Sequence, residues 1–231
     1  MSDRRAPILL SRQLQHAMPL AVVWMVGLVV LWIASLQDAA SLEELFLDPA
    51  TLAGQPWYQG LLANLGTRGW SVGVVAAGGG AWVSMRAGRP TAVTFLGSAA
   101  LITMLLLLDD LLQSHAVILP ATGMNPTAAQ IVVVAPAPLW MWLHRAEIAR
   151  SRWLLLLAAL GGFVVSLTAD MVVEGAGSAA LLVEDGAKLL GIIAWAQYFL
   201  LTARDITGSV ITAALGHTDR AWSIDEPVRI P

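Results

Sequence analysis

Three groups of charged side chains interrupt otherwise apolar stretches of this sequence, and their residue types could bind a metal ion or carry protons. They are Asp109 and Asp110 with His115, Asp170 with Glu174, and Glu184 and Asp185 with Lys188. A charge inside a bilayer costs about 2.5–3.5 kcal/mol on insertion scales, so such charges normally face the interior of a bundle and serve a function. We therefore treat these three groups as one candidate site.

Our leading hypothesis for these residues is a divalent-metal site. Carboxylate oxygens and imidazole nitrogens suit Zn, Mn or Fe, and a bound cation would relieve the repulsion among several acids. The predicted ligands are Asp109, Asp110, His115, Asp170, Glu174, Glu184 and Asp185. An open coordination position would activate water for hydrolysis of a lipid amide or ester. Asp109 and Asp110 are then the predicted catalytic carboxylates.

Helical spacing predicts which members of this set meet. Residues four apart lie on one face of a helix, so Glu184 and Lys188 are predicted to form an ion pair. Asp109 and Asp110 are about 100° apart around a helix, so we expect one of them to point at the shared cavity. We expect His115 to join the site from its rim.

Other functions fit the same residues. In proton- or cation-coupled transport, buried carboxylates alternate between charged and neutral forms. In a non-catalytic membrane subunit, the charges would serve only as structural ion pairs. A third reading is an enzyme for an apolar substrate, such as a membrane isoprenoid cyclase, because the ten tryptophans could line a pocket around a general acid.

One zinc-dependent class can be compared directly. Alkaline ceramidase and PAQR-type hydrolases hold zinc largely through histidines, including a His-x-x-x-His pair. The four histidines here include no such pair. The comparison therefore gives the hydrolase hypothesis no support.

Composition places the candidate site in a membrane protein. The 231 residues are 57% hydrophobic and 13% charged, with a mean hydropathy of +0.70, whereas a soluble domain has roughly 25% charged residues. The net charge of −3 and the lack of a basic run argue against nucleic-acid binding. The absence of cysteine excludes disulfides and thiolate metal sites.

Six apolar segments are close to the length of a membrane span. They are residues 18–36, 69–85, 92–118, 128–143, 153–173 and 179–203. A backbone exposed to lipid must satisfy its hydrogen bonds within its own segment, so each is expected to be a helix. The predicted fold is all-α, an integral membrane bundle of about six transmembrane helices. Residues 1–204 would form this polytopic domain, with an external loop at 37–68 and a cytoplasmic tail at 205–231.

Small residues and prolines predict how two of these helices pack. Close approach of a neighbouring backbone is expected at Gly69, Gly73, Gly78, Gly79 and Gly80. Pro136 and Pro138 are expected to bend the fourth span.

The basic residues predict the orientation of the chain. If the amino terminus is inside, every basic residue except Arg68 and Lys188 lies on the cytoplasmic side. Both termini are then cytoplasmic, and all three acidic groups lie near the external surface of a cell inner membrane. The expected partners are membrane lipids, with a second copy of the chain or another membrane subunit as a further candidate.

Overall fold

The computed structural model describes residues 24–25, 28–29, 31–32, 36, 53–56, 59–172 and 178–221. The chain divides into two compact units, Met1–Gly60 and Leu61–Pro231. The predicted first span, 18–36, and most of the predicted external loop, 37–68, belong to the first unit and lie largely outside the described residues.

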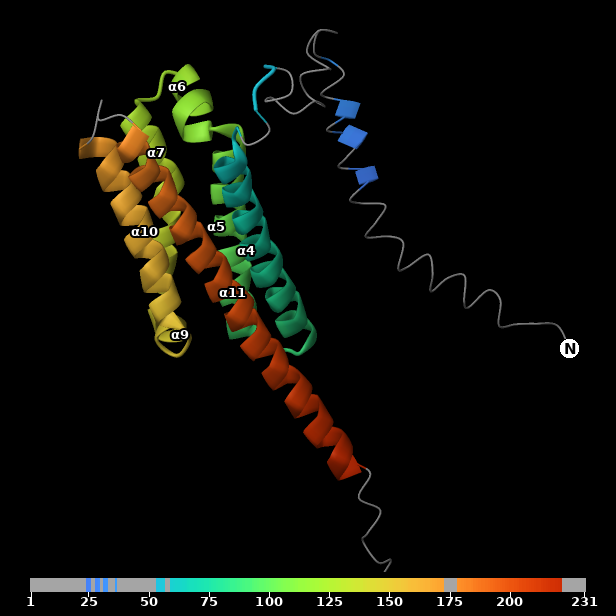
Figure 1. Cartoon of the computed structure of the whole chain (residues 1–231). Coiled ribbons are helices and arrows are strands. Elements are labelled where there is room, and N and C mark those ends of the chain that lie inside the picture. Colours follow the sequence, from blue (N-terminus) through green and yellow to red (C-terminus); the bar gives the residue numbers. More distant parts are fainter. Residues whose placement is uncertain are drawn as a thin grey trace, which may run out of the picture. The chain divides into compact units, whose positions relative to one another are not determined.

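The described part of the second unit is built from helices and turns, without a strand (Figure 1). Its elements are α4 (Leu61–Arg86), α5 (Pro90–Leu112), the π-helix η1 (Ser114–Ile118), α6 (Leu119–Ala121), α7 (Pro126–Val134), α8 (Pro136–Leu143), α9 (Arg145–Ala149), α10 (Trp153–Val172) and α11 (Ser178–Ala221). The long helix α11 packs against α4 and α10, and α4 also packs against α5. The predicted all-α class is confirmed for the described residues.

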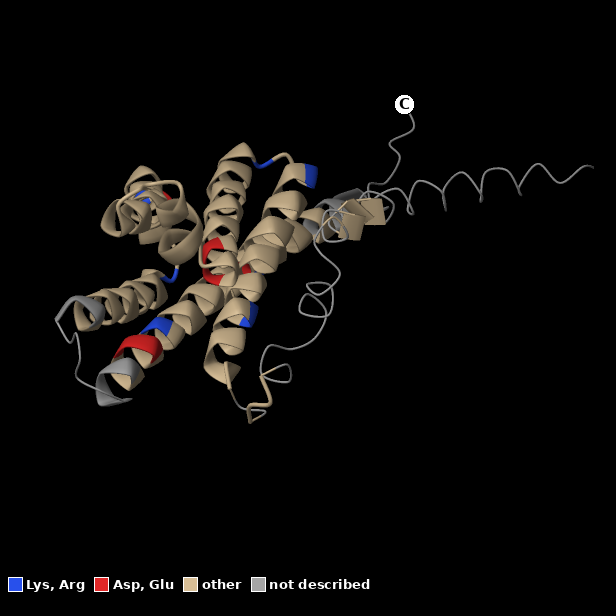
Figure 2. Cartoon of the chain, turned by 90° about the horizontal axis from the view of Figure 1, so that it is seen from above, with Lys and Arg blue, Asp and Glu red and all other residues tan. Residues whose placement is uncertain are grey.

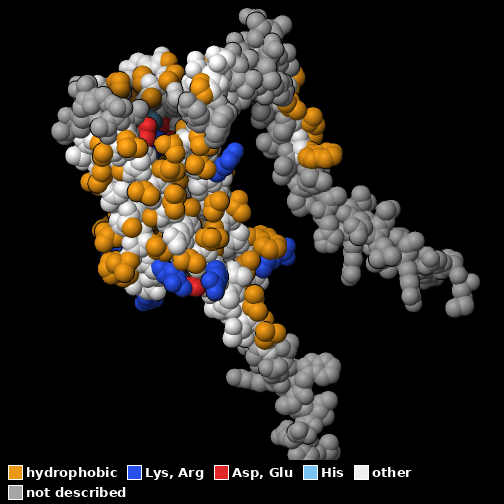
Figure 3. All heavy atoms as spheres, viewed as in Figure 1, with side chains coloured by type: hydrophobic (Ala, Val, Ile, Leu, Met, Phe, Trp, Pro, Cys, Tyr) orange, Lys and Arg blue, Asp and Glu red, His pale blue; other side chains and the backbone are white. Residues whose placement is uncertain are grey.

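Three helical stretches of the described chain are long and apolar enough to cross a membrane: Pro90–Leu112, Pro126–Leu143 and Leu182–Leu215. A shorter apolar helical segment covers Trp153–Ala169 in α10. Large apolar side chains point away from the bundle, such as Val75 on α4, Leu101 on α5 and Leu190 on α11. Hydrophobic side chains spread over the flank of the unit in Figure 3. An apolar exterior of this extent is typical of a surface that contacts lipid.

Three helix boundaries differ from the predicted spans. Helix α4 begins at Leu61 rather than at residue 69, directly after a turn in which Gly60 has a φ of 72°. Helix α5 ends at Leu112 because Gln113 adopts a left-handed conformation. Helix α11 continues to Ala221, so the predicted tail from residue 205 is helical as far as it is described. No proline interrupts it before Pro227.

The fourth predicted span is broken where its two prolines predict a bend. Helix α7 ends at Val134 and α8 begins at Pro136, with Ala135 between them. Proline has no N–H to donate, so the hydrogen-bond ladder loses two links at Pro136 and Pro138. The N–H of Leu139 resumes the ladder by donating to the carbonyl oxygen of Ala135 over 3.3 Å.

Aromatic rings fill the space between the helices. Successive contacts, with centroids 5.2–6.3 Å apart, connect Trp70, Phe163, Trp195, Phe199, Trp140 and Phe95. The indole N–H of Trp195 donates to the hydroxyl of Thr103 over 3.0 Å, and both side chains are buried. Five helices therefore share one core.

Glycines allow α4 to approach its neighbours closely at some of the predicted positions. A Cβ built on Gly80 would lie 2.8 Å from Leu96 Cδ1 and 2.9 Å from Ala203 Cβ. A Cβ on Gly69 would lie 2.7 Å from Ile192 Cγ2, whereas a Cβ on Gly79 would meet nothing within 4 Å. The predicted close approach of neighbouring helices is therefore confirmed at Gly69 and Gly80, and it does not occur at Gly79.

Candidate functional site

The chain turns sharply where α5 ends, and this turn brings Asp109 and His115 together. Gln113 has a φ of 50°, which is uncommon for a residue other than glycine. The π-helix η1 follows, so that the backbone N–H of His115 donates to Asp109 Oδ1 over 2.8 Å. The ring nitrogen Nδ1 of His115 lies 2.7 Å from Asp109 Oδ2. One carboxylate therefore fixes both the backbone and the ring of His115, which offsets the strain at Gln113.

Asp110 faces a different helix from its neighbour. Its Oδ1 accepts a hydrogen bond from Lys188 Nζ of α11 over 2.5 Å, and the side chains are 15% and 41% exposed. Consecutive residues on a helix are about 100° apart, which explains why Asp109 and Asp110 have different partners. Glu184, for which the sequence predicts an ion pair with Lys188, lies one turn earlier on α11 and is half-buried. That ion pair stays a prediction.

Helix α4 passes close to the same carboxylate. A Cβ built on Gly66 would lie 3.6 Å from Asp110 Oδ2 and 3.3 Å from Ile192 Cδ1. Gly66 is buried, so the carboxylate lies where α4, α5 and α11 meet. Figure 2 looks down on the bundle and marks acidic and basic positions among its helices. We call this the acidic end of the unit, defined by Asp109, Asp110, His115 and Lys188.

The described part of the chain holds no group of three or more His, Asp or Glu side chains that could bind a metal ion. Glu174 lies outside the described residues, and the side chain of Asp170 is not described. Asp185 is exposed on α11. The seven-ligand metal site therefore stays a prediction, of which the structure brings together Asp109 and His115.

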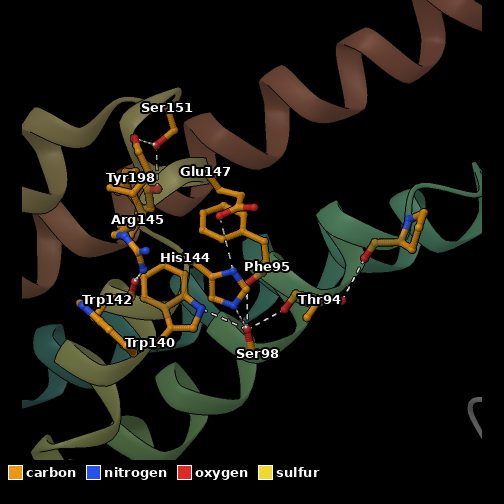
Figure 4. A network of polar contacts seen from close by, with 12 residues as sticks. Thr94, Phe95, Ser98, Trp140, Trp142, His144, Arg145, Glu147, Ser151 and Tyr198 are labelled. Carbon is orange, nitrogen blue, oxygen red and sulfur yellow. Dashed lines mark hydrogen bonds and ion pairs between the residues drawn. The ribbon is translucent and has the colours of Figure 1, made fainter.

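The opposite end of the unit carries a polar cluster that the sequence analysis missed (Figure 4). Ser98 of α5 accepts a hydrogen bond from the indole N–H of Trp140 over 3.1 Å and lies 3.3 Å from Nε2 of His144. Nδ1 of His144 lies 3.8 Å from an oxygen of Glu147. These residues belong to α5, α8, α9 and the junction before α9, so no local spacing pattern could have grouped them.

The order Ser98, His144 and Glu147 matches the connectivity of a catalytic triad, but the hydrogen bonds favour a structural role. The hydroxyl of Ser98 donates its single proton to backbone carbonyl oxygens, that of Thr94 over 2.6 Å and that of Phe95 over 3.2 Å. His144 Nε2 must then act as the donor in its contact with Ser98. A nucleophilic serine requires the reverse direction, with the histidine accepting the hydroxyl proton. The cluster therefore joins α5 to α8 and α9.

Several arginines stand at the end of α4, before α5 and around α9, which we call the arginine end and define by Arg86, Arg89, Arg145, Arg150 and Arg152. Figure 3 shows basic side chains gathered at one end of the unit. Arg152 donates to both oxygens of Asp205 on α11, over 3.0 and 3.3 Å. The hydrogen bond to Asp205 raises the pKa of the Arg152 guanidinium above its ordinary value. Both side chains are about half exposed. This pair therefore joins α11 to the start of α10 at the surface of the unit.

Comparison with known proteins identifies a family. Residues 20–202 match the family described as a domain of unknown function (DUF8692). No curated protein and no solved structure matches the chain. The match includes all the residues that define the acidic end.

Proposed function

We propose that this chain, which belongs to the DUF8692 family, is a multi-pass membrane protein that takes up and releases protons at its acidic end in a transport step. The observation that carries this proposal is the contact between Asp110 and Lys188, which connects two helices that each have a membrane-length apolar stretch. Opposite charges within such helices stabilise one another, whereas either charge alone is costly there. Protonation of Asp110 would remove this attraction to Lys188. Proton occupancy is thereby coupled to the side-chain contact between α5 and α11.

The neighbouring pair supplies a second proton-binding group. Asp109 contacts the ring of His115 at 2.7 Å, and each of the two ring nitrogens of an imidazole can carry a proton. The side chain of His115 is 32% exposed and that of Asp109 only 13%. His115 is thus the member of the acidic end that can exchange protons with water, next to the less accessible carboxylates.

The proposal includes a topology of six spans, with both termini in the cytoplasm of a cell with an inner membrane. Its support is the distribution of charge, because α4 ends at Arg86 and α5 begins after Arg89 at the end of the unit where α9 lies, whereas Asp110 is near the other end of α5 (Figure 1). Positively charged flanks are retained on the cytoplasmic side, so the acidic end would face outward. Residues 1–204 would form the membrane domain and residues from 205 onward the cytoplasmic extension.

The test is proton flux in proteoliposomes that contain a pH-sensitive dye. We expect Asp110→Asn and Lys188→Gln each to lower the flux about tenfold or more, since each change removes a charge on which the coupling depends. Asp205→Asn is the matched control, because it removes a carboxylate at the arginine end. Unchanged flux in a folded Asp110→Asn variant would contradict the proposal and favour a non-catalytic subunit with structural ion pairs.

Divalent-metal binding is the second candidate, and a specific contact favours it. A metal-binding histidine usually donates its other ring N–H to a carboxylate, which fixes the orientation of the ring. Asp109 has this relation to Nδ1 of His115, so Nε2 would be the ligand. Further ligands would come from Asp170, Glu174, Glu184 and Asp185, and Zn, Mn or Fe would suit this donor set.

Elemental analysis of gently extracted protein separates the two candidates. Stoichiometric metal that is lost in His115→Ala and Glu174→Gln would support the metal site. Release of a fatty acid or a base from lipid would then test the hydrolase reading. A wild-type protein without metal would contradict both and leave proton coupling in place.

A further inference from the structure

A cavity of about 520 Å³ lies at the arginine end, between the start of α5, the segment around α9, and α11. This volume is within the range of small-molecule sites, roughly 300–1,000 Å³. Four charged side chains line it: Arg89, Glu147, Arg150 and Asp205. Its residues are separate from those of the acidic end, so it does not depend on the function proposed above.

The charges in this cavity favour an anionic ligand. Asp205 is already neutralised by Arg152, which donates to both of its oxygens. Arg150 makes no side-chain hydrogen bond within the described part of the chain and is exposed. Arg89 and Arg150 therefore line the cavity together with Glu147, whose carboxylate lies 3.8 Å from Nδ1 of His144.

Arg89 is held in place for such a ligand. Its guanidinium donates to the hydroxyl of Ser209 over 2.5 Å and to the carbonyl oxygen of Ser209 over 3.3 Å. A guanidinium has five N–H donors in a rigid fork, so three remain for a ligand. Planar, preorganised donors of this kind suit phosphate oxygens.

The cavity also has an apolar side. The side chains of Phe95 and Ile206 line it together with Pro90, and Pro90 is the first residue of a stretch long and apolar enough to cross a membrane. The cavity therefore lies where a membrane-crossing helix begins, which is the depth of lipid headgroups. A ligand there has phosphate within reach of arginine and hydrocarbon along the adjoining helix.

We propose that this cavity binds the phosphate group of a phospholipid, with Arg89 and Arg150 as the residues that hold the phosphate. Glu147 lies where it can contact the ammonium of an ethanolamine headgroup. Basic pockets between membrane helices bind anionic lipid headgroups by the same chemistry.

The experiment is native mass spectrometry of the full chain in detergent, titrated with phosphatidylethanolamine. We expect Arg89→Gln/Arg150→Gln to weaken binding about tenfold or more, since charge-assisted hydrogen bonds to the phosphate are lost. Arg145→Gln is the matched control. It removes the same charge from α9, but Arg145 lies over the Trp142 ring and donates to the Trp142 carbonyl oxygen over 3.0 Å. We expect its affinity to stay within about twofold of wild type.

Competition experiments distinguish the source of the phosphate. Displacement of the lipid by inorganic phosphate at equal concentration would overturn the lipid assignment, and equal competition by diacylglycerol would overturn the role of the headgroup. An equal loss in Arg145→Gln would mean general charge attraction and would also overturn the proposal. If circular dichroism shows that the double variant is unfolded, the exposed Arg150→Gln alone provides the test, with a weaker but still specific loss expected.

Discussion

The two ends of the helical unit contain similar ion pairs in different surroundings. At the acidic end the carboxylates of Asp109 and Asp110 are 13% and 15% exposed, and Asp110 lies within an apolar helix. At the arginine end Arg152 and Asp205 are 51% and 50% exposed. Removal of one partner from the first kind of pair leaves a poorly hydrated charge, whereas in the second kind water replaces the partner. The surroundings of a charge pair, more than its distance, decide how much it stabilises the fold.

The two ends also differ in what lies between α4 and its neighbouring helices. Next to Asp110, a methyl group on Gly66 would meet only Ile192 and the carboxylate, at 3.3 and 3.6 Å. Towards the other end of α4, a methyl group on Gly80 would lie under 3 Å from both Leu96 and Ala203. The Asp110 carboxylate and Ile192 thus lie in the space beside Gly66, whereas the side chains of Leu96 and Ala203 come closer to the backbone at Gly80.

The largest effect is expected from breaking the pair at the acidic end. Asp110→Asn or Lys188→Met should each lower the free energy of unfolding by about 2–4 kcal/mol, because the remaining charge loses this partner between apolar helices. The double variant should lose less than either single one. Unfolding of all four proteins in detergent gives the double-mutant cycle, and additive losses would contradict the interpretation.

A smaller effect is expected from the close contact of α4 with its neighbours. Gly80→Ala should cost about 1–3 kcal/mol through overpacking. Gly79→Ala is the adjacent control, and it should be neutral or stabilising by up to about 1 kcal/mol, because alanine favours a helix and the position is open. Thermal unfolding of the two variants measures the contrast. Equal effects would mean that the helices are not in contact at Gly80.

The turn after α5 gives the third prediction. Asp109→Ala removes both hydrogen bonds to His115, and we expect a loss of about 1–2 kcal/mol. His115→Ala keeps the backbone N–H bond and should cost less. Hydrogen exchange in Ser114–Ile118 should rise more in Asp109→Ala than in His115→Ala, and the reverse order would contradict the capping role of Asp109.

The smallest effect is expected at Arg152. Asp205 raises the pKa of this guanidinium. The stabilisation of the fold by the Arg152–Asp205 pair is therefore fully present below the unfolded-state pKa of the arginine, and it is lost only as the pH rises through the raised value. Arg152→Gln should therefore lower the free energy of unfolding only a little, and by the same amount at pH 6 and pH 9. Added salt should reduce this difference between the variant and the wild type further. Stability measured at both pH values checks this, and a large loss would show that the two ends are alike.

Features that repeat along the chain could be predicted from the sequence. The apolar segments predict the helices, and Pro136 and Pro138 predict that the fourth span bends before α8. The glycines of α4 predict that neighbouring helices approach it closely. These follow from local rules, in which a residue type acts on its own helix or on whatever packs beside it.

Features that depend on how helices meet could not be predicted in the same way. Asp110, which contacts Lys188, lies 78 residues away from it on α5, and helical spacing on one helix cannot point to such a partner. The left-handed Gln113 carries no signal, since glutamine has no special preference for positive φ. Ser98, His144 and Glu147 meet only because α5 packs near the junction of α8 and α9.

The length of α11 has a mechanical consequence. Its 44 residues span about 66 Å, at 1.5 Å per residue, whereas a hydrocarbon layer is about 30 Å thick. Trp195, which is 1% exposed, marks the packed region about which such a rod would pivot if it tilted. A tilt of about 10° there would swing the end at Ala221 by roughly 7 Å at this rise. Lys188 sits on the short arm, so a small movement at the acidic end becomes a larger displacement beyond the arginine end.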